Sequence, residues 1–196
     1  MNVSNNKQVK HVLMIGMISS FSYWACYFAR NILSVMSPQI VKTSSITVEF
    51  IGTLSTANML SYAVGQLVNG MIGDRVKAKY LVSGGLTLAG ICIAIVGLSG
   101  NPMIMIIAYS MMGFFLSMLY APLIRLIAEN TQPSHAVRCC LGLSFASLLG
   151  APTAGAVALF FNWKVAFVLC GMTMAIVGSI FFVFVFGLEK KGIGEV

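Results

Sequence analysis

The sequence predicts an all-α, polytopic membrane protein with six transmembrane helices. Of its 196 residues, 58% are hydrophobic and 9% are charged, whereas an ordinary soluble domain is roughly 45–50% apolar and about 25% charged. A soluble fold of this composition would expose apolar surface almost everywhere, which argues against a globular cytosolic enzyme. A helix needs about 20 apolar residues to cross a bilayer, so the chain has room for about six crossings.

Six apolar runs, separated by short polar segments, give the predicted helices. They extend over Val12–Met36, Phe50–Ile72, Tyr80–Leu98, Met103–Ile127, Cys139–Phe161 and Val165–Leu188. Membrane β-strands would alternate over about ten residues, so these longer runs indicate helices, which satisfy their own backbone hydrogen bonds. The first run is longer than the core of a signal peptide, about 7–15 residues, and we expect a retained anchor. The predicted organisation is a cytoplasmic segment over 1–11, a six-helix bundle over 12–188 and the start of a cytoplasmic loop over 189–196.

Lysine and arginine predict the orientation, because cytoplasmic loops are enriched in both. With a cytoplasmic N-terminus, the cytoplasmic side collects Lys7, Lys10, Arg75, Lys77, Lys79, Arg138, Lys190 and Lys191. The opposite side keeps only Lys42 and Lys164. This bias accounts for the net charge of +7 without a nucleic-acid partner. We expect a multi-pass protein of the cell (inner) membrane with both ends of this chain in the cytoplasm.

A charged residue inside the first run is the main functional candidate. An arginine at the bilayer centre costs roughly 2.5–3.5 kcal/mol on insertion scales, and Arg30 lies well within the run. Tyr23 and Tyr27 precede it by seven and three residues and share its helical face. Arg30 can snorkel to the head groups, or it can bind an anion, especially phosphate, which suits the guanidinium fork.

The second run carries a polar stripe. Asn58, Tyr62, Gln66 and Asn69 follow one another at spacings of four, four and three residues. Such a stripe can join helices by hydrogen bonds or line a water-filled cavity, and the neighbouring tyrosine–arginine face favours the cavity. The predicted substrate site consists of Arg30, Tyr23, Tyr27, Tyr62, Asn58 and Gln66.

Arg125, near the inner end of the fourth run, is a second-rank candidate. Glu129 follows it by one helical turn, so we expect a snorkelling side chain with a partial ion pair. Tyr120 and Pro122 can mark a helix kink near the cavity.

Residues for enzyme chemistry are scarce. Both histidines, His11 and His135, lie in predicted cytoplasmic segments, and no carboxylate lies in the middle of a run. The five cysteines show no metal-ligand spacing. We therefore predict neither an enzyme nor a metal or cofactor site.

The segment after the second run resembles a signature of the major facilitator superfamily. It reads Gly70-Met-Ile-Gly-Asp74-Arg75-Val-Lys77-Ala-Lys79. Pro133 with Arg138, Gly150-x-Pro152-x-x-Gly155 and Asn162-Trp163-Lys164-x-x-Phe167 also resemble the N-terminal half of that superfamily. The resemblance implies one half of a major facilitator fold, built from two three-helix inverted repeats, that works by alternating access. It also implies a cytoplasmic gate made by Gly70, Asp74, Arg75, Lys77, Lys79 and Arg138.

A narrower resemblance concerns the first two runs. Tyr23-x3-Tyr27-x2-Arg30-x7-Pro38 is similar to the organophosphate:phosphate antiporters, which carry glycerol-3-phosphate or hexose phosphates. The resemblance implies that Arg30 holds the substrate phosphate together with an arginine from the other half. Where the glycerol-3-phosphate carriers have a lysine and a histidine, this sequence has Gln66 and Phe145. A phosphate ester, a carboxylate and another small anion therefore stay open as substrates.

The superfamily uses two six-helix halves with the substrate between them, and this chain corresponds to one half. We favour a partial sequence whose C-terminal six-helix half is missing. A half-transporter that pairs with a second copy and a non-transporting membrane sensor or subunit stay open as alternatives. The expected function is secondary active transport of small organic anions, in the first place phosphate esters exchanged for phosphate. The expected partners are the anion, the lipid bilayer and the other half.

Overall fold

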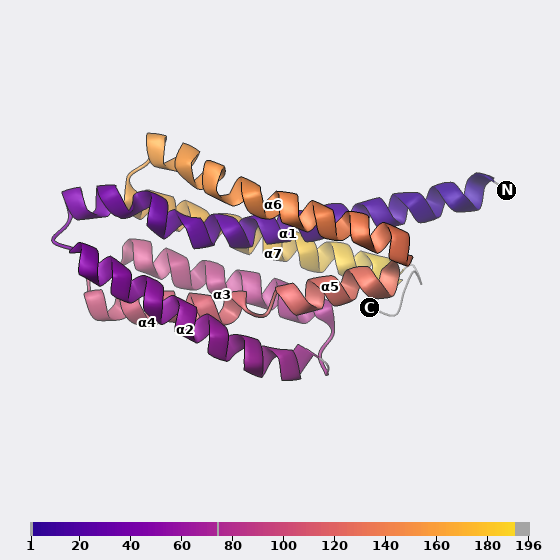
Figure 1. Cartoon of the computed structure of the whole chain (residues 1–196), viewed down its shortest axis with the longest axis horizontal. Helices are drawn as coiled ribbons and strands as arrows, with labels where there is room; N and C mark the ends of the chain where they lie inside the picture. Colours follow the sequence, from indigo (N-terminus) through magenta and orange to yellow (C-terminus); the bar gives the residue numbers. More distant parts are fainter. Residues whose placement is uncertain (1, 74, 191–196) are drawn as a thin grey trace.

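The structure is a computed structural model. It describes the backbone of residues 2–73 and 75–190 and the side chains of 12–73, 75–133 and 135–187. Within that part of the chain every regular element is a helix: α1 (Asn2–Thr43), α2 (Val48–Gly73), α3 (Ala78–Leu98), α4 (Pro102–Leu116), α5 (Tyr120–Asn130), α6 (Pro133–Phe160) and α7 (Trp163–Lys190). The helices run side by side along one long axis (Figure 1). The predicted all-α class is confirmed.

The fourth predicted run is two helices rather than one. α4 ends at Leu116 and α5 begins at Tyr120. Pro122 has no N–H to donate to the carbonyl one turn earlier, which weakens the helix at that point. The backbone tightens instead: Met118 donates to Phe115 and Leu119 to Leu116, the three-residue spacing of a 3₁₀ turn. The break lies where Pro122 predicts a kink.

Five helical segments are long and apolar enough to cross a membrane, judged by length and composition. They are Val12–Thr43, Ala78–Leu98, Pro102–Asn130, His135–Phe160 and Trp163–Gly187. α4 and α5 together make one of these segments. α2 has 26 residues, about 39 Å, which is enough to cross a hydrocarbon core of about 30 Å. Its asparagines and glutamine lower its hydropathy, and it packs mainly against α4 at the edge of the bundle (Figure 1).

Three helix pairs make the main contacts in the bundle: α1 with α6, α2 with α4, and α3 with α7. With α4 and α5 counted as one span, α1–α6 pairs the first span with the fifth, and α2–α4 pairs the second with the fourth. If spans one to three are exchanged with spans four to six, the pair of the first and fifth spans becomes the pair of the fourth and second spans. The pair of the third and sixth spans, α3–α7, stays the same. Each repeat has three spans, so the second repeat starts on the opposite side of the membrane, as in an inverted repeat.

Glycines let the α3–α7 pair approach closely. A Cβ atom on Gly90 of α3 would lie 2.6 Å from the backbone oxygen of Gly171 on α7, so only a residue without a side chain fits there. Small residues at such crossings replace the hydrophobic effect as a source of helix association in lipid. Phe167 and Phe181 of α7 are fully buried in the hydrophobic core. The α3–α7 pair therefore forms a tightly packed layer of the bundle.

Candidate functional site

The guanidinium group of Arg30 lies between α1 and α2. Its Cζ atom is 4.1 Å from the ring centre of Tyr62 on α2 and 5.7 Å from that of Tyr27 on α1. Both distances are within the range of a cation–π interaction. Arg30 is half-buried, and among the described residues it forms no ion pair. α1 and α2 are consecutive yet make few direct contacts, so Arg30 and Tyr62 provide a contact between them.

Tyrosines from three helices surround this position. The Tyr23 hydroxyl donates to the Tyr27 hydroxyl over 3.5 Å, and the two ring centres are 5.0 Å apart. The Tyr23 ring lies 5.9 Å from the ring of Tyr120, the first residue of α5. Gln66 donates from Nε2 to the Tyr62 hydroxyl over 3.2 Å. The structure thus brings together five of the six residues of the predicted substrate site.

Close packing behind Tyr27 fixes the backbone of α1 at the site. A Cβ atom on Gly150 of α6 would lie 2.7 Å from the Cβ of Tyr27, so the two helices touch there. One turn later, Asn31 donates from Nδ2 to the Tyr27 carbonyl over 2.7 Å. Tyr27 is therefore held on a helix that cannot shift away from α6 without opening this contact.

The polar stripe of α2 faces two different neighbours: Tyr62 and Gln66 lie beside Arg30 of α1, and the two asparagines contact α4. Asn58, only 8% exposed, donates from Nδ2 to the Tyr109 carbonyl of α4 over 2.7 Å. Asn69, only 3% exposed, donates to the Ser117 hydroxyl over 2.6 Å. Both asparagines join α2 to α4 by interhelical hydrogen bonds. Asn58 is the one predicted site residue that the described contacts place in this helix interface and not beside Arg30.

Tyr120 is a neighbour of the predicted site that the sequence analysis named only as the mark of a helix kink. Its ring contacts Tyr23, and it stands directly after the break between α4 and α5. The available signal was its position before Pro122, which pointed only to a kink. The contact depends on how α5 is turned relative to α1, and helical spacing alone does not contain that information.

Arg125 has a different environment. Its Nε donates to Oε1 of Glu129 over 2.7 Å, and Nη1 donates to the carbonyl of Gly73 over 2.9 Å. Gly73 is the last residue of α2, where the carbonyls lack helical partners and the helix dipole favours a cation. The predicted partial ion pair with Glu129 is confirmed, with both side chains nearly half exposed. Arg125 additionally binds the end of α2, beside the predicted gating segment.

The gating segment connects α2 to α3. Asp74 lies outside the described residues. Arg75 and Val76 donate from their backbone N–H groups to the Ile72 carbonyl over 3.0 and 3.1 Å, which makes a turn after α2. Gly70 has open space around the position of a side chain, and Lys77 precedes the first residue of α3.

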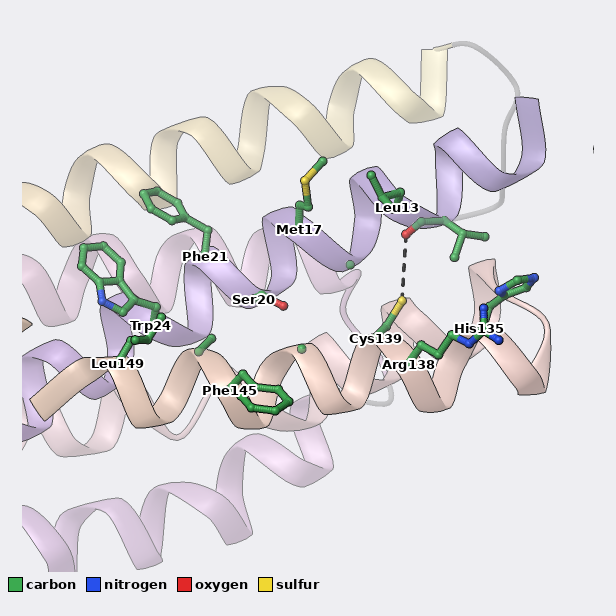
Figure 2. A pocket seen from close by; sticks show the side chains of 14 residues that line it. Leu13, Met17, Ser20, Phe21, Trp24, His135, Arg138, Cys139, Phe145 and Leu149 are labelled. Atoms are coloured by element: carbon green, nitrogen blue, oxygen red, sulfur yellow. Dashed lines mark hydrogen bonds between the residues drawn. The ribbon is translucent and has the colours of Figure 1, made fainter. Parts of the chain in front are cut away.

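Lys79 is the unusual cation of this segment because it is only 4% exposed. Its ammonium group lies 5.0 Å from the ring centre of Tyr80 and 5.3 Å from that of Phe186 on α7. Arg138, the remaining predicted gating residue, lines a groove between α1 and α6 next to His135 (Figure 2). Among the described gating residues, Lys79 thus contacts α7, whereas Arg138 lies at the α1–α6 groove.

The described side chains contain no group of three or more His, Cys, Asp or Glu that could hold a metal ion. All five cysteines are free thiols. The chemistry available beside Arg30 is that of one cation, several hydroxyls and an amide. Such a set can bind an anion by charge and hydrogen bonds.

Comparison with known proteins gives a family match and several relatives. Residues 19–195 match the model of the Major Facilitator Superfamily. An uncharacterized transporter of Buchnera aphidicola subsp. Schizaphis graminum is 27% identical over 188 residues, 93% of this chain and 44% of that protein. The membrane sensor protein UhpC of Salmonella typhimurium is 28% identical over 93 residues, 47% of this chain and 21% of that protein. The glucose-6-phosphate exchanger SLC37A2 of Xenopus tropicalis is 40% identical over 50 residues, 26% of this chain and 10% of that protein. This chain spans less than half the length of each of these relatives.

Proposed function

This chain belongs to the major facilitator superfamily, and on that premise we propose that it forms the six-helix half of a secondary transporter for small organic anions. Its proposed substrates are phosphate esters, exchanged for phosphate by alternating access. Two relatives are named a transporter and a glucose-6-phosphate exchanger, and none of the relatives above is named as an enzyme. The family match agrees with the prediction that the chain is not an enzyme.

The observation that carries this proposal is the placement of Arg30. Stacking on the Tyr62 ring at 4.1 Å uses the flat face of the guanidinium group. The five N–H donors point outward in the plane of the group, so they stay available for a ligand. A phosphate can accept two of them at once in a bidentate pair. In a site partly shielded from water, that attraction is stronger than at a protein surface.

The charge of the site bears on the substrate class. Arg30 is accompanied by neutral groups: Tyr62, its partner Gln66, and the tyrosines of α1 and α5. One positive charge balances a singly charged anion, and a doubly charged phosphate ester needs a second cation. We propose that this cation comes from a second six-helix half, either of the same protein or of a second copy. A singly charged carboxylate is the alternative substrate.

We propose that the gate lies at the end of α2. Gly70, Asp74, Arg75, Lys77 and Lys79 follow one another there, and Arg125 binds the carbonyl of Gly73. A movement of α2 relative to α5 would break this hydrogen bond. We propose an inner-membrane location with this basic end of the bundle in the cytoplasm, because it carries most of the lysines and arginines.

A second candidate function is a membrane sensor that keeps a carrier fold and transports nothing. The relative named a membrane sensor protein favours this candidate. A sensor would bind a phosphate ester on the same arginine, so binding alone does not separate the two functions. Flux does.

The test is exchange by the complete carrier, including a second half, reconstituted in phosphate-loaded vesicles with labelled glucose 6-phosphate outside. Arg30→Lys keeps the charge and removes the planar fork, and we expect uptake to fall about thirtyfold, the loss of a charged hydrogen bond of about 2 kcal/mol. Lys42→Gln, an exposed basic residue at the end of the same helix, is the matched control. Binding without uptake in the wild type would favour the sensor, and an unchanged uptake rate in Arg30→Lys would remove Arg30 from the site.

A further inference from the structure

An apolar groove runs between α1 and α6, separate from the face that carries Tyr23, Tyr27 and Arg30. Its volume is about 700 Å³. Figure 2 shows Met17, Phe21 and Trp24 on the α1 side and Phe145 and Leu149 on the α6 side. The Phe21 and Trp24 rings are stacked, with centres 5.2 Å apart, and give the groove a flat aromatic wall. A methylene chain can pack on such a wall without any polar partner.

The two basic residues of the groove, His135 and Arg138, lie at one end. His135 and Arg138 stand in the first two turns of α6, and Figure 2 shows their side chains close to each other, beyond the apolar part. Arg138 is exposed, and in the described part of the chain it forms no ion pair. The N-terminal end of a helix also favours an anion. The groove thus has a long apolar body and a positively charged head.

The groove has the length of one membrane leaflet. Arg138 and Leu149 are eleven residues apart on α6, which is about 16 Å along the helix. Half of a hydrocarbon core of about 30 Å is about 15 Å. A molecule with its head at Arg138 would therefore reach the middle of the bilayer with its tail beside Trp24 and Leu149.

The charged end of the groove lies at the basic end of the bundle. The α2–α3 and α5–α6 connections are at the same end of the molecule (Figure 1), and they are flanked by Arg75, Lys77 and Arg138. Basic pockets between transmembrane helices on the cytoplasmic side bind the head groups of anionic lipids. A soluble phosphate ester would match Arg138 and leave the apolar body of the groove uncovered.

We propose that this groove binds an anionic phospholipid. The phosphate group contacts Arg138 and His135, and one acyl chain lies along Trp24 and Phe145. The lipid holds α1 and α6 together from the side of this groove. This site does not depend on Arg30 or on transport, so the proposal can fail while the proposed function holds, and the reverse.

Trp24 offers a direct probe, because the chain has only two tryptophans. The other, Trp163, is 4% exposed and begins α7, at the opposite end of α6 from Arg138. The protein is reconstituted in phosphatidylcholine vesicles that contain a small fraction of lipid brominated in its acyl chains. Bromine atoms quench tryptophan fluorescence on contact. Subtracting the signal of a Trp24→Phe variant, which keeps the ring stacking, isolates Trp24.

We expect brominated phosphatidylglycerol to quench Trp24 at about one fifth of the fraction needed with brominated phosphatidylcholine, the preference that one interfacial cation confers. Arg138→Gln should abolish this preference, and Arg138→Lys should keep most of it. Arg75→Gln, with the same loss of charge at the same end but outside the groove, should leave it unchanged.

Two results would overturn the proposal. Equal quenching by both brominated lipids would show that the groove holds ordinary bulk lipid. An unchanged preference in Arg138→Gln would show that Arg138 does not bind the lipid head group.

Discussion

Arg30 and Arg125 both lie within apolar runs of this chain, and the structure surrounds them differently. Arg125 donates from Nε to the Glu129 carboxylate and from Nη1 to the last carbonyl of α2, so these two nitrogens already have partners within the protein. Arg30 is held by aromatic faces, at 4.1 Å from Tyr62 and 5.7 Å from Tyr27. Those contacts hold the group and use no N–H donor.

This difference separates a structural cation from one that is prepared for a ligand. A cation in a membrane protein needs compensation for the water that it loses. Arg125 obtains it from an acidic side chain and a helix end within the protein. Arg30 obtains only part of it from ring faces, and an anionic substrate would supply the rest. The comparison predicts that removing Arg30 affects binding, whereas removing Arg125 affects stability.

The largest expected effect concerns ligand binding by Arg30→Gln. Removing the whole guanidinium group eliminates the charged, bidentate contact, and we expect the affinity for a phosphate ester to fall about a hundredfold, or about 2.7 kcal/mol. The melting temperature without ligand should change little, since no described carboxylate loses its partner. The measurement is the stabilisation by glucose 6-phosphate in a thermal unfolding assay, which follows affinity. A large loss of stability without ligand would show that Arg30 is structural.

Arg125→Gln should give the opposite pattern. The variant loses the contact to Gly73 and the ion pair, which is nearly half exposed and therefore contributes little. We expect a loss of about 1 kcal/mol in the free energy of unfolding. The loss should be local, so amide hydrogen exchange over 70–73 should accelerate about fivefold. Unchanged exchange at the end of α2 would contradict the capping role of Arg125.

The division within α2 gives a third prediction. Asn58→Ala removes the side-chain donor to the Tyr109 carbonyl, and we expect a stability loss of about 0.6–1.7 kcal/mol, as for interhelical hydrogen bonds in lipid. Ligand affinity should stay within about twofold. Gln66→Ala should show the reverse, with a small loss of affinity and unchanged stability. Equal effects of the two variants on ligand affinity would show that Asn58 belongs to the substrate site, as the sequence predicts.

The smallest expected effect is that of Tyr62 on the position of Arg30. Tyr62→Leu removes the ring face and should lower ligand affinity about threefold, which corresponds to a cation–π interaction of about 0.7 kcal/mol. Tyr62→Phe keeps the ring and should retain most of the affinity. If both variants weakened binding equally, the hydroxyl and not the ring would be the important group.

Much of the fold could be predicted from the apolar runs and from the polar segments and prolines that interrupt them. The six apolar runs correspond to the helices, and Pro122 marks the division between α4 and α5. The spacing of Arg125 and Glu129 was sufficient to predict their ion pair, because residues four apart share a helix face. These features depend on neighbours within one helix.

The partners of the α2 stripe could not be predicted in the same way. Spacing shows that Asn58, Tyr62, Gln66 and Asn69 lie on one side of a helix, but it does not show which helix they meet. Asn58 contacts Tyr109, 51 residues away, and Tyr62 contacts Arg30. The same limit applies to Arg138, whose motif suggested a gate and whose neighbours are the α1–α6 groove and His135.

Whether Arg30 binds the substrate phosphate is tested most directly by the distance between the arginine side chains and a bound phosphate. Solid-state NMR of the reconstituted carrier, with arginine ¹⁵N-labelled only in this six-helix half and a ³¹P-containing sugar phosphate, measures this coupling for the four arginines of this chain. We predict an N–P distance of roughly 4 Å, as expected for a charge-assisted hydrogen bond, that disappears in Arg30→Lys and persists in Arg125→Lys. A coupling that survives in Arg30→Lys and is lost in Arg125→Lys would show that Arg125, and not Arg30, binds the phosphate.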